Sequence, residues 1–233
     1  MLDGIPLRGL LHSYITLKKL SRINDIERFG WNLDDSLKEL SHNDYATILN
    51  NSKRYETVTE HILESFLIAL LYLPALSHTN KEYDKQKILN MILVHDIGES
   101  YTGDYPPMYE KYRDKKEEEN EFCKKLFMSG LLYNTSDLME YLYLWNEWSK
   151  IDTNDYNVKI AKEIDAIQLL YKLFTLISEG RLSLTQERIC DFWKASKKIQ
   201  SREGKNIFNI LIVKNPNFVE TGKKYNIDVK MLV

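Results

Sequence analysis

The sequence has little glycine, proline or cysteine: nine Gly, five Pro and two Cys among 233 residues. Few helix breakers, with long stretches of 3.6-residue apolar periodicity and little strict alternation, favour an all-α helical bundle. Cys123 and Cys190 have no CxxC spacing and no neighbouring histidine, so neither a redox motif nor a zinc motif is indicated. A reducing cytosol would keep both as thiols, and we predict that both are small core residues.

An excess of charge and a long hydrophobic run are also missing. The formal net charge of −2 provides no basic field for a nucleic-acid backbone, so we expect no polynucleotide partner. The longest uncharged apolar stretch, residues 65–77, contains Pro74 and is shorter than the roughly 20 residues that a membrane-spanning helix needs. No secretory signal is visible at the start of the chain, and we expect a cytoplasmic protein.

The apolar periodicity predicts the helices and their approximate limits. Thr57 and Glu60 have the spacing of a capping box at a helix start, and Pro74 ends the same helix. Gly180 is expected to end the helix before it, as a C-terminal cap with a left-handed backbone conformation. The expected helical ranges are 57–73, 84–99, 113–128, 137–148, 157–179 and 184–200. The short apolar run 207–213 is either a strand or a buried helical turn. The mixed-charge run 115–119, with Glu121 close behind, is predicted to be a solvated helix face.

The length suits one domain with a short appendage. We predict an N-terminal extension over residues 1–20, a core over 21–180, and a helical C-terminal appendage over 181–233 packed on the core. The segment 101–107 contains a glycine and paired prolines, which cannot continue a helix. Asp104 is therefore expected on a loop.

Several metal-ligating side chains lie in or beside apolar helical patterns. Adjacent His95 and Asp96 can both reach one cation, although the pair alone occurs by chance in many proteins. Asp165 lies inside an apolar pattern, where a carboxylate needs a cation, a salt bridge or several donors. His61 taken singly is best explained as a core histidine. Glu99 follows His95 by four residues, on the same side of a continuing helix.

Taken together and in order, these residues resemble a known family. The segments 59–61, 93–104 and 162–165 are similar to the HD-domain metal-dependent phosphohydrolases, closest to their 5'-deoxynucleotidase branch. The family pattern is H…HD…D, and the branch extends it as HD-xx-E-xxx-GD-x-P, which Gly103-Asp104-Tyr105-Pro106 matches without a gap. The resemblance covers about residues 20–180.

The resemblance implies a metal site and an acid–base pair. It assigns four ligands to one divalent ion (Mn, Co, Mg, Fe or Zn): His61, His95, Asp96 and Asp165. Glu99 and Asp104 match the acidic catalytic pair, one acting on water and the other on the leaving 5'-oxygen. Which residue has which role stays open.

The resemblance also implies a substrate pocket. Arg28 matches the arginine that clamps phosphate, but the longer interval before His61 leaves Arg54 as a rival. Phe29 would lie beside the sugar. Asp104, together with Tyr105 and Pro106, would form the loop edge of the pocket.

The function implied is hydrolysis of the 5'-phosphate of (deoxy)nucleoside monophosphates, by a homodimer acting on a small-molecule nucleotide. One alternative is a deoxynucleoside triphosphate triphosphohydrolase, whose more basic pocket could be supplied by Lys53, Arg54, Lys111, Arg113 and Lys115. Another is a catalytically silent nucleotide-binding sensor. The presence of both Glu99 and Asp104 argues against a silent module.

Overall fold

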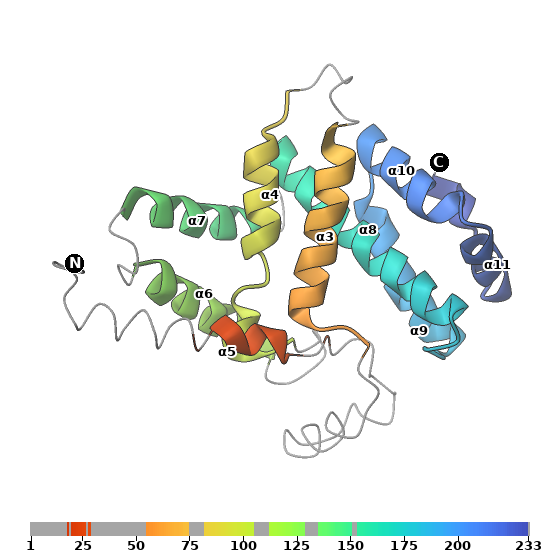
Figure 1. Cartoon of the computed structure of the whole chain (residues 1–233), viewed down its shortest axis with the longest axis horizontal. Coiled ribbons are helices and arrows are strands. Elements are labelled where there is room, and N and C mark those ends of the chain that lie inside the picture. The colour runs from red at the N-terminus through yellow and green to blue at the C-terminus, as the bar shows by residue number, and fades with distance from the viewer. Residues whose placement is uncertain are drawn as a thin grey trace, which may run out of the picture. The chain divides into compact units, whose positions relative to one another are not determined.

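The computed structural model describes residues 18, 20–26, 28, 55–74, 82–104, 112–128, 135–150 and 153–232 (Figure 1). Helices form most of these residues, and no β-strand occurs among them. The all-α fold predicted from the sequence is confirmed. No helix in the described ranges is long and apolar enough to cross a membrane.

The chain forms two compact units. The first comprises Met1–Ile62 and Val94–Asn146, and the second comprises Leu63–Leu93 and Glu147–Val233. The backbone passes from one unit to the other inside helices α3, α4 and α7. The predicted boundaries at residues 20 and 180 stay a prediction.

The first unit contains η1 (Ser21–Asn24), the start of α3 (Val58–Tyr72), α5 (Glu99–Thr102), α6 (Tyr112–Met128) and most of α7 (Thr135–Trp148). Its core includes Phe122, Leu142 and Trp145, all buried. Phe122 of α6 stacks on Tyr101 of α5 with ring centroids 5.3 Å apart, which fixes the short helix α5 against α6. Cys123 is buried, as predicted.

The capping box at the start of α3 is confirmed. The Thr57 amide donates to Glu60 Oε2 at 2.6 Å, and the Glu60 amide donates to Thr57 Oγ1 at 3.2 Å. Both backbone N–H groups would otherwise lack an intrahelical partner. This reciprocal pair fixes the first turn of α3, and with it the position of His61.

The second unit is built around α8 (Tyr156–Ser178), whose N-cap Asp155 accepts from the Asn157 amide. Gly180 follows α8 with φ 68°, the left-handed conformation predicted for it. The remaining elements are α4 (Lys85–Val94), α9 (Gln186–Trp193), η5 (Lys194–Lys198), α10 (Arg202–Phe208), the π-helix η6 (Asn209–Val213), α11 (Pro216–Lys224) and η7 (Val229–Leu232). The run 207–213 is helical. Cys190 is exposed, so its predicted place in the core is wrong.

The predicted helix over residues 84–99 is too long. Helix α4 ends at Val94, and a tight turn over residues 95–98 leads into α5. Within the turn the Ile97 amide donates to the Val94 carbonyl at 3.2 Å and the Glu99 amide to the Asp96 carbonyl at 3.0 Å, both to the third residue back. A Cβ on Gly98 would lie 2.9 Å from Glu119 Cγ, so the turn approaches α6 closely. This turn carries the site.

Candidate metal centre and acid–base site

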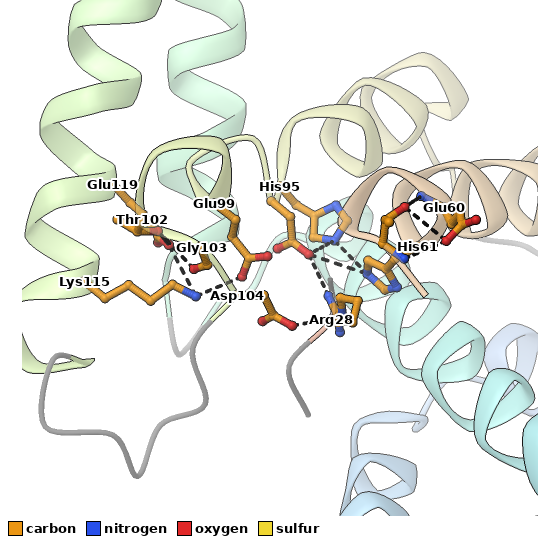
Figure 2. A network of polar contacts seen from close by, with 12 residues as sticks. Arg28, Glu60, His61, His95, Glu99, Thr102, Gly103, Asp104, Lys115 and Glu119 are labelled. Atoms are coloured by element: carbon orange, nitrogen blue, oxygen red, sulfur yellow. Dashed lines mark hydrogen bonds and ion pairs between the residues drawn. The ribbon is translucent and has the colours of Figure 1, made fainter. Parts of the chain in front are cut away.

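Two histidines and an aspartate converge in the first unit. His61 comes from the first turns of α3, whereas His95 and Asp96 come from the turn after α4. The two Nε2 atoms lie 3.2 Å apart, and Asp96 Oδ2 lies 3.1 Å from His95 Nε2 and 3.6 Å from His61 Nε2 (Figure 2). Both histidine side chains are buried, while Asp96 keeps 17% exposure. The three donor atoms therefore meet at one place on the edge of the interior.

The donor set fits a divalent metal ion. Ligand bonds of about 2.0–2.2 Å place neighbouring donors around one ion roughly 2.8–3.6 Å apart, in octahedral or tetrahedral geometry. The three separations of 3.1–3.6 Å agree with that spacing. Two imidazoles and a carboxylate suit several first-row ions and leave coordination positions for other ligands. The structure thus brings together three of the four predicted ligands, His61, His95 and Asp96, as a group that could hold a metal ion.

Asp165, the fourth predicted ligand, lies on α8 in the second unit. It is half-buried, whereas its neighbours Ile164 and Ala166 are buried. Its role as a metal ligand stays a prediction.

Arg28 reaches the cluster because its backbone pairs with the residues that precede α3. The Arg28 amide donates to the Glu56 carbonyl at 2.8 Å, and the Val58 amide donates to the Ile26 carbonyl at 2.9 Å. From there Arg28 Nη1 donates to Asp96 Oδ2 at 3.0 Å, and its Nε lies 3.5 Å from Asp104 Oδ2. The rival Arg54 and the pocket candidates Phe29, Tyr105 and Pro106 lie outside the described residues.

Glu99 and Asp104 flank the cluster at the two ends of α5. Glu99 is its first residue and is 8% exposed. Gly103 follows the helix with φ 82°, a conformation that favours glycine, and its amide donates to the Glu99 carbonyl at 2.8 Å. The chain therefore turns directly after α5 and brings Asp104 to Arg28, as Figure 2 shows.

Lys115 is a site residue whose position the sequence analysis missed. It was expected on a solvated helix face, yet it is 7% exposed. Its Nζ lies 3.0 Å from Glu99 Oε1 and 3.5 Å from Glu119 Oε1. Thr102 Oγ1 donates to the same Glu119 oxygen at 2.9 Å. Helical spacing could have found Lys115, because it shares one face of α6 with buried Phe122 and Leu126.

Burial and neighbouring charges move the pKa values of these groups in opposite directions. Burial alone would raise the pKa of Asp96, but His95, Arg28 and His61 outweigh it and hold that pKa below its usual value. Burial raises the pKa of Glu99, and the charges of Asp104 and Asp96 raise it further. A carboxyl group in a site whose pKa is raised by burial and by specific neighbouring charges is a candidate for acid–base chemistry.

Comparisons with known proteins agree with this fold. A family model described as HD domain matches residues 38–207. The chain belongs to the HD domain family. The predicted family is confirmed, and the prediction of an enzyme is supported at the level of the family.

Three curated relatives carry the name 5'-deoxynucleotidase. HDDC2 of Dictyostelium discoideum is 27% identical over 51% of this chain, and the match spans 62% of that relative's length, less than two thirds. HDDC2 of Bos taurus is 23% identical over 72% of this chain, and the match spans 68% of that relative's length. YBR242W of Saccharomyces cerevisiae is 23% identical over 71% of this chain, and the match spans 66% of that relative's length.

Solved structures share the fold. A protein of Pyrococcus horikoshii superposes on this chain with a TM-score of 0.60 at 18% identity. The superposition covers 85% of this chain and 95% of the Pyrococcus horikoshii chain. A Magnetospirillum magnetotacticum protein, described as a predicted metal-dependent phosphohydrolase, gives a TM-score of 0.57 at 20% identity over 96% and 98% of the two chains. At these identities the likeness concerns the fold alone.

Proposed function

We propose that this protein is a metal-dependent phosphohydrolase that releases phosphate from (deoxy)nucleoside 5'-monophosphates. The observation that carries the proposal is that the ligand atoms of His61, His95 and Asp96 lie close enough together to hold one metal ion. The curated relatives named 5'-deoxynucleotidase support the substrate class. A cytoplasmic homodimer stays a prediction.

The residues of the cluster have distinct parts in the proposed reaction. His61, His95 and Asp96, with Asp165 as the fourth ligand, would hold one divalent ion. When bound, that ion polarises a phosphate oxygen and lowers the pKa of water. The side chains around it then act on the substrate and on the protons.

Arg28 supplies a permanent planar cation beside the ligand cluster, which suits a phosphate group. Glu99 and Asp104 supply two carboxyl groups, one to take the proton of the attacking water and one to protonate the leaving 5'-oxygen. Both remain candidates for either role. The pKa of Glu99, raised by burial and by Asp104 and Asp96, lets it hold a proton at a higher pH than an ordinary glutamate does.

The alternatives receive less support from the described residues. Lys115 was one of the cations that could serve a triphosphate pocket, but its ammonium group is held by Glu99 and Glu119. A silent sensor would have no need of a buried carboxylate beside the ligand cluster, since burying Glu99 is costly. The first observation favours a monophosphate over a triphosphate substrate, and the second favours hydrolysis over sensing.

A product assay tests the proposal directly. The purified chain is stripped with a chelator, reloaded with Mn, Co or Mg, and given deoxynucleoside mono-, di- and triphosphates. We expect metal-dependent release of inorganic phosphate from the monophosphates. Release of tripolyphosphate would instead establish the triphosphohydrolase, and nucleotide binding without any product would establish the sensor.

Arg28 is expected to affect both binding and turnover. A guanidinium group that grips the transferred phosphoryl group contacts it in the ground state and in the transition state, so Arg28→Ala should raise KM and lower kcat. Arg28→Lys should recover only part of the loss because the two-pronged donor is gone. Steady-state kinetics on a deoxynucleoside monophosphate measure both effects.

Arg54→Ala is the comparison for this prediction and should change the kinetics much less. Near-normal kinetics in Arg28→Ala, together with a collapse in Arg54→Ala, would transfer the phosphate role to Arg54. The metal cluster would be unaffected by that result.

Asp165→Asn tests the fourth ligand. The substitution keeps the size of the side chain and removes its charge, so a metal ligand at this position should become much weaker. We expect metal affinity and phosphate release to fall at least roughly 10- to 100-fold. Residues that only contact a metal ligand already contribute that much, and a ligand itself should contribute more. Titration of the stripped protein with Co, followed by its absorption spectrum, measures the affinity.

Asp191→Asn is a matched control in the same unit, since Asp191 is a partly exposed aspartate paired with Lys194 at 2.6 Å. It should bind metal like the wild type. Unchanged affinity in Asp165→Asn would remove Asp165 from the ligand set.

A further inference from the structure

Lys115 occupies an unusual place for a lysine. It lies in the second turn of α6, is 7% exposed, and directs its ammonium group toward α5 (Figure 2). Its two partners are Glu99 Oε1 at 3.0 Å and Glu119 Oε1 at 3.5 Å. A buried ammonium group loses its hydration, so a lysine is seldom placed there without a specific carboxylate partner.

The two oxygens of Glu99 have different surroundings. Oε1 accepts the hydrogen bond from Lys115. Oε2 is buried and has no hydrogen-bond partner in the part of the chain that the structure describes. A buried carboxylate oxygen without a partner is rare in folded proteins, and such groups are often functional. Lys115 thus leaves one oxygen of Glu99 available.

The charges that face Glu99 come from four segments. Asp96 from the turn after α4 and Asp104 from the end of α5 repel its charged form, whereas Lys115 from α6 and Arg28 from the segment after η1 attract it. Arg28 is already shared with Asp96 and Asp104. Lys115 is therefore the cation that serves Glu99 by direct contact.

We propose that Lys115 is a positioning residue for the reaction: it holds the Glu99 carboxyl group through Oε1 and so presents Oε2 to the reacting water or the leaving oxygen. Glu119 and Thr102 support it, because the Thr102 hydroxyl donates to the Glu119 oxygen that faces the ammonium group. The inference rests on the proposed function, since it assigns Lys115 to the same site.

A double-mutant cycle tests the proposal. Lys115→Met keeps most of the side-chain length and removes the charge. We expect kcat for a deoxynucleoside monophosphate to fall roughly 10- to 100-fold, a loss comparable to that caused by removing a hydrogen-bond partner of a metal ligand. KM and bound metal should change little, because Lys115 contacts neither the three ligands nor Arg28.

The decisive measurement is made in the Glu99→Gln background. If Lys115 acts through Glu99, adding Lys115→Met to Glu99→Gln should lower kcat by less than about twofold, because coupled residues are not additive. Lys115→Arg should restore part of the single-mutant loss, since it keeps a cation on α6. Losses that multiply in the double mutant would overturn the proposal and leave Lys115 a structural residue.

Lys125→Met is the matched control. Lys125 lies on the same helix and forms an ion pair with Glu121 at the same 3.0 Å, but its side chain is 77% exposed. The kcat of Lys125→Met should equal that of the wild type. If Lys115→Met yields no folded protein, the cycle is built from Lys115→Arg, and multiplicative losses again refute the role.

The two hypotheses fail in different ways. A metal-loaded wild type that releases no phosphate refutes the proposed function before any variant is made. An active wild type with normal kcat in Lys115→Met refutes the positioning role alone.

Discussion

Replacement of Asp96 by Ala is expected to abolish phosphate release while the helical fold survives. Asp96 Oδ2 is the atom that faces both imidazoles and Arg28, so its loss removes one of three clustered ligands. A metal ion supplies several kcal/mol of transition-state stabilisation, and about 1.4 kcal/mol corresponds to a tenfold rate. Turnover should therefore fall on the order of 10³-fold or more. His95→Ala should behave alike.

The fold should survive because the turn is held by its backbone. The Ile97, Glu99 and Ser100 amides donate to the Val94, Asp96 and Ile97 carbonyls at 3.0–3.2 Å, and none of these bonds uses the Asp96 side chain. Circular dichroism should show unchanged helix content, while elemental analysis should show only a small fraction of one metal ion per chain.

Asp114→Ala provides the comparison for this prediction. Asp114 is an exposed aspartate in the first turn of α6, within the same unit. It should keep both metal and activity. Full metal occupancy and normal turnover in Asp96→Ala or His95→Ala would show that the cluster is not the metal site.

Local signals were sufficient to predict much of the fold. Thr57 and Glu60 marked the start of α3 because the capping box is a contact between neighbouring residues. Gly180 marked the end of α8 for a similar reason. The end of α4 was missed, because the helical spacing of His95 and Glu99 continues the apolar pattern past Val94, whereas the turn at Gly98 approaches Glu119 on a different helix. A tertiary contact of that kind leaves no local signal.

The candidate site was predictable where a motif covers it. His61, His95 and Asp96 were chosen from their order and spacing, and the structure brings their ligand atoms together. Arg28 was predicted with Arg54 as a rival, since the pairing of its backbone with Glu56 is invisible in the sequence. Lys115 was missed because the surrounding charges suggested solvent, although its helical spacing to Phe122 and Leu126 indicated the interior.

Glu99→Gln is expected to retain the metal ion and lose most of the turnover. Glutamine keeps the shape of the side chain, and its oxygen can still accept from Lys115, but it cannot transfer a proton. Glu99 does not belong to the three-residue ligand group. We expect kcat to fall roughly 10²- to 10⁴-fold, the usual contribution of a positioned acid or base, with bound metal unchanged.

The pH profile adds a second readout for Glu99. Burial and the charges of Asp104 and Asp96 raise the pKa of Glu99 above the usual glutamate value. The deprotonation of Glu99 should therefore appear as a limb of the plot of kcat against pH, at a pH above the usual glutamate pKa. If Glu99 is the base, activity rises with pH along that limb. If Glu99 is the acid, activity falls along it.

The same limb should be absent from Glu99→Gln, because glutamine does not titrate. Glu121→Gln, which removes an exposed carboxylate from the Lys125 pair, should keep both the limb and the turnover. Wild-type turnover in Glu99→Gln would exclude Glu99 from proton transfer and leave Asp104 as the remaining carboxyl group of the pair. Loss of the metal ion would instead make Glu99 a ligand, and the buried Oε2 would then be the atom that binds it.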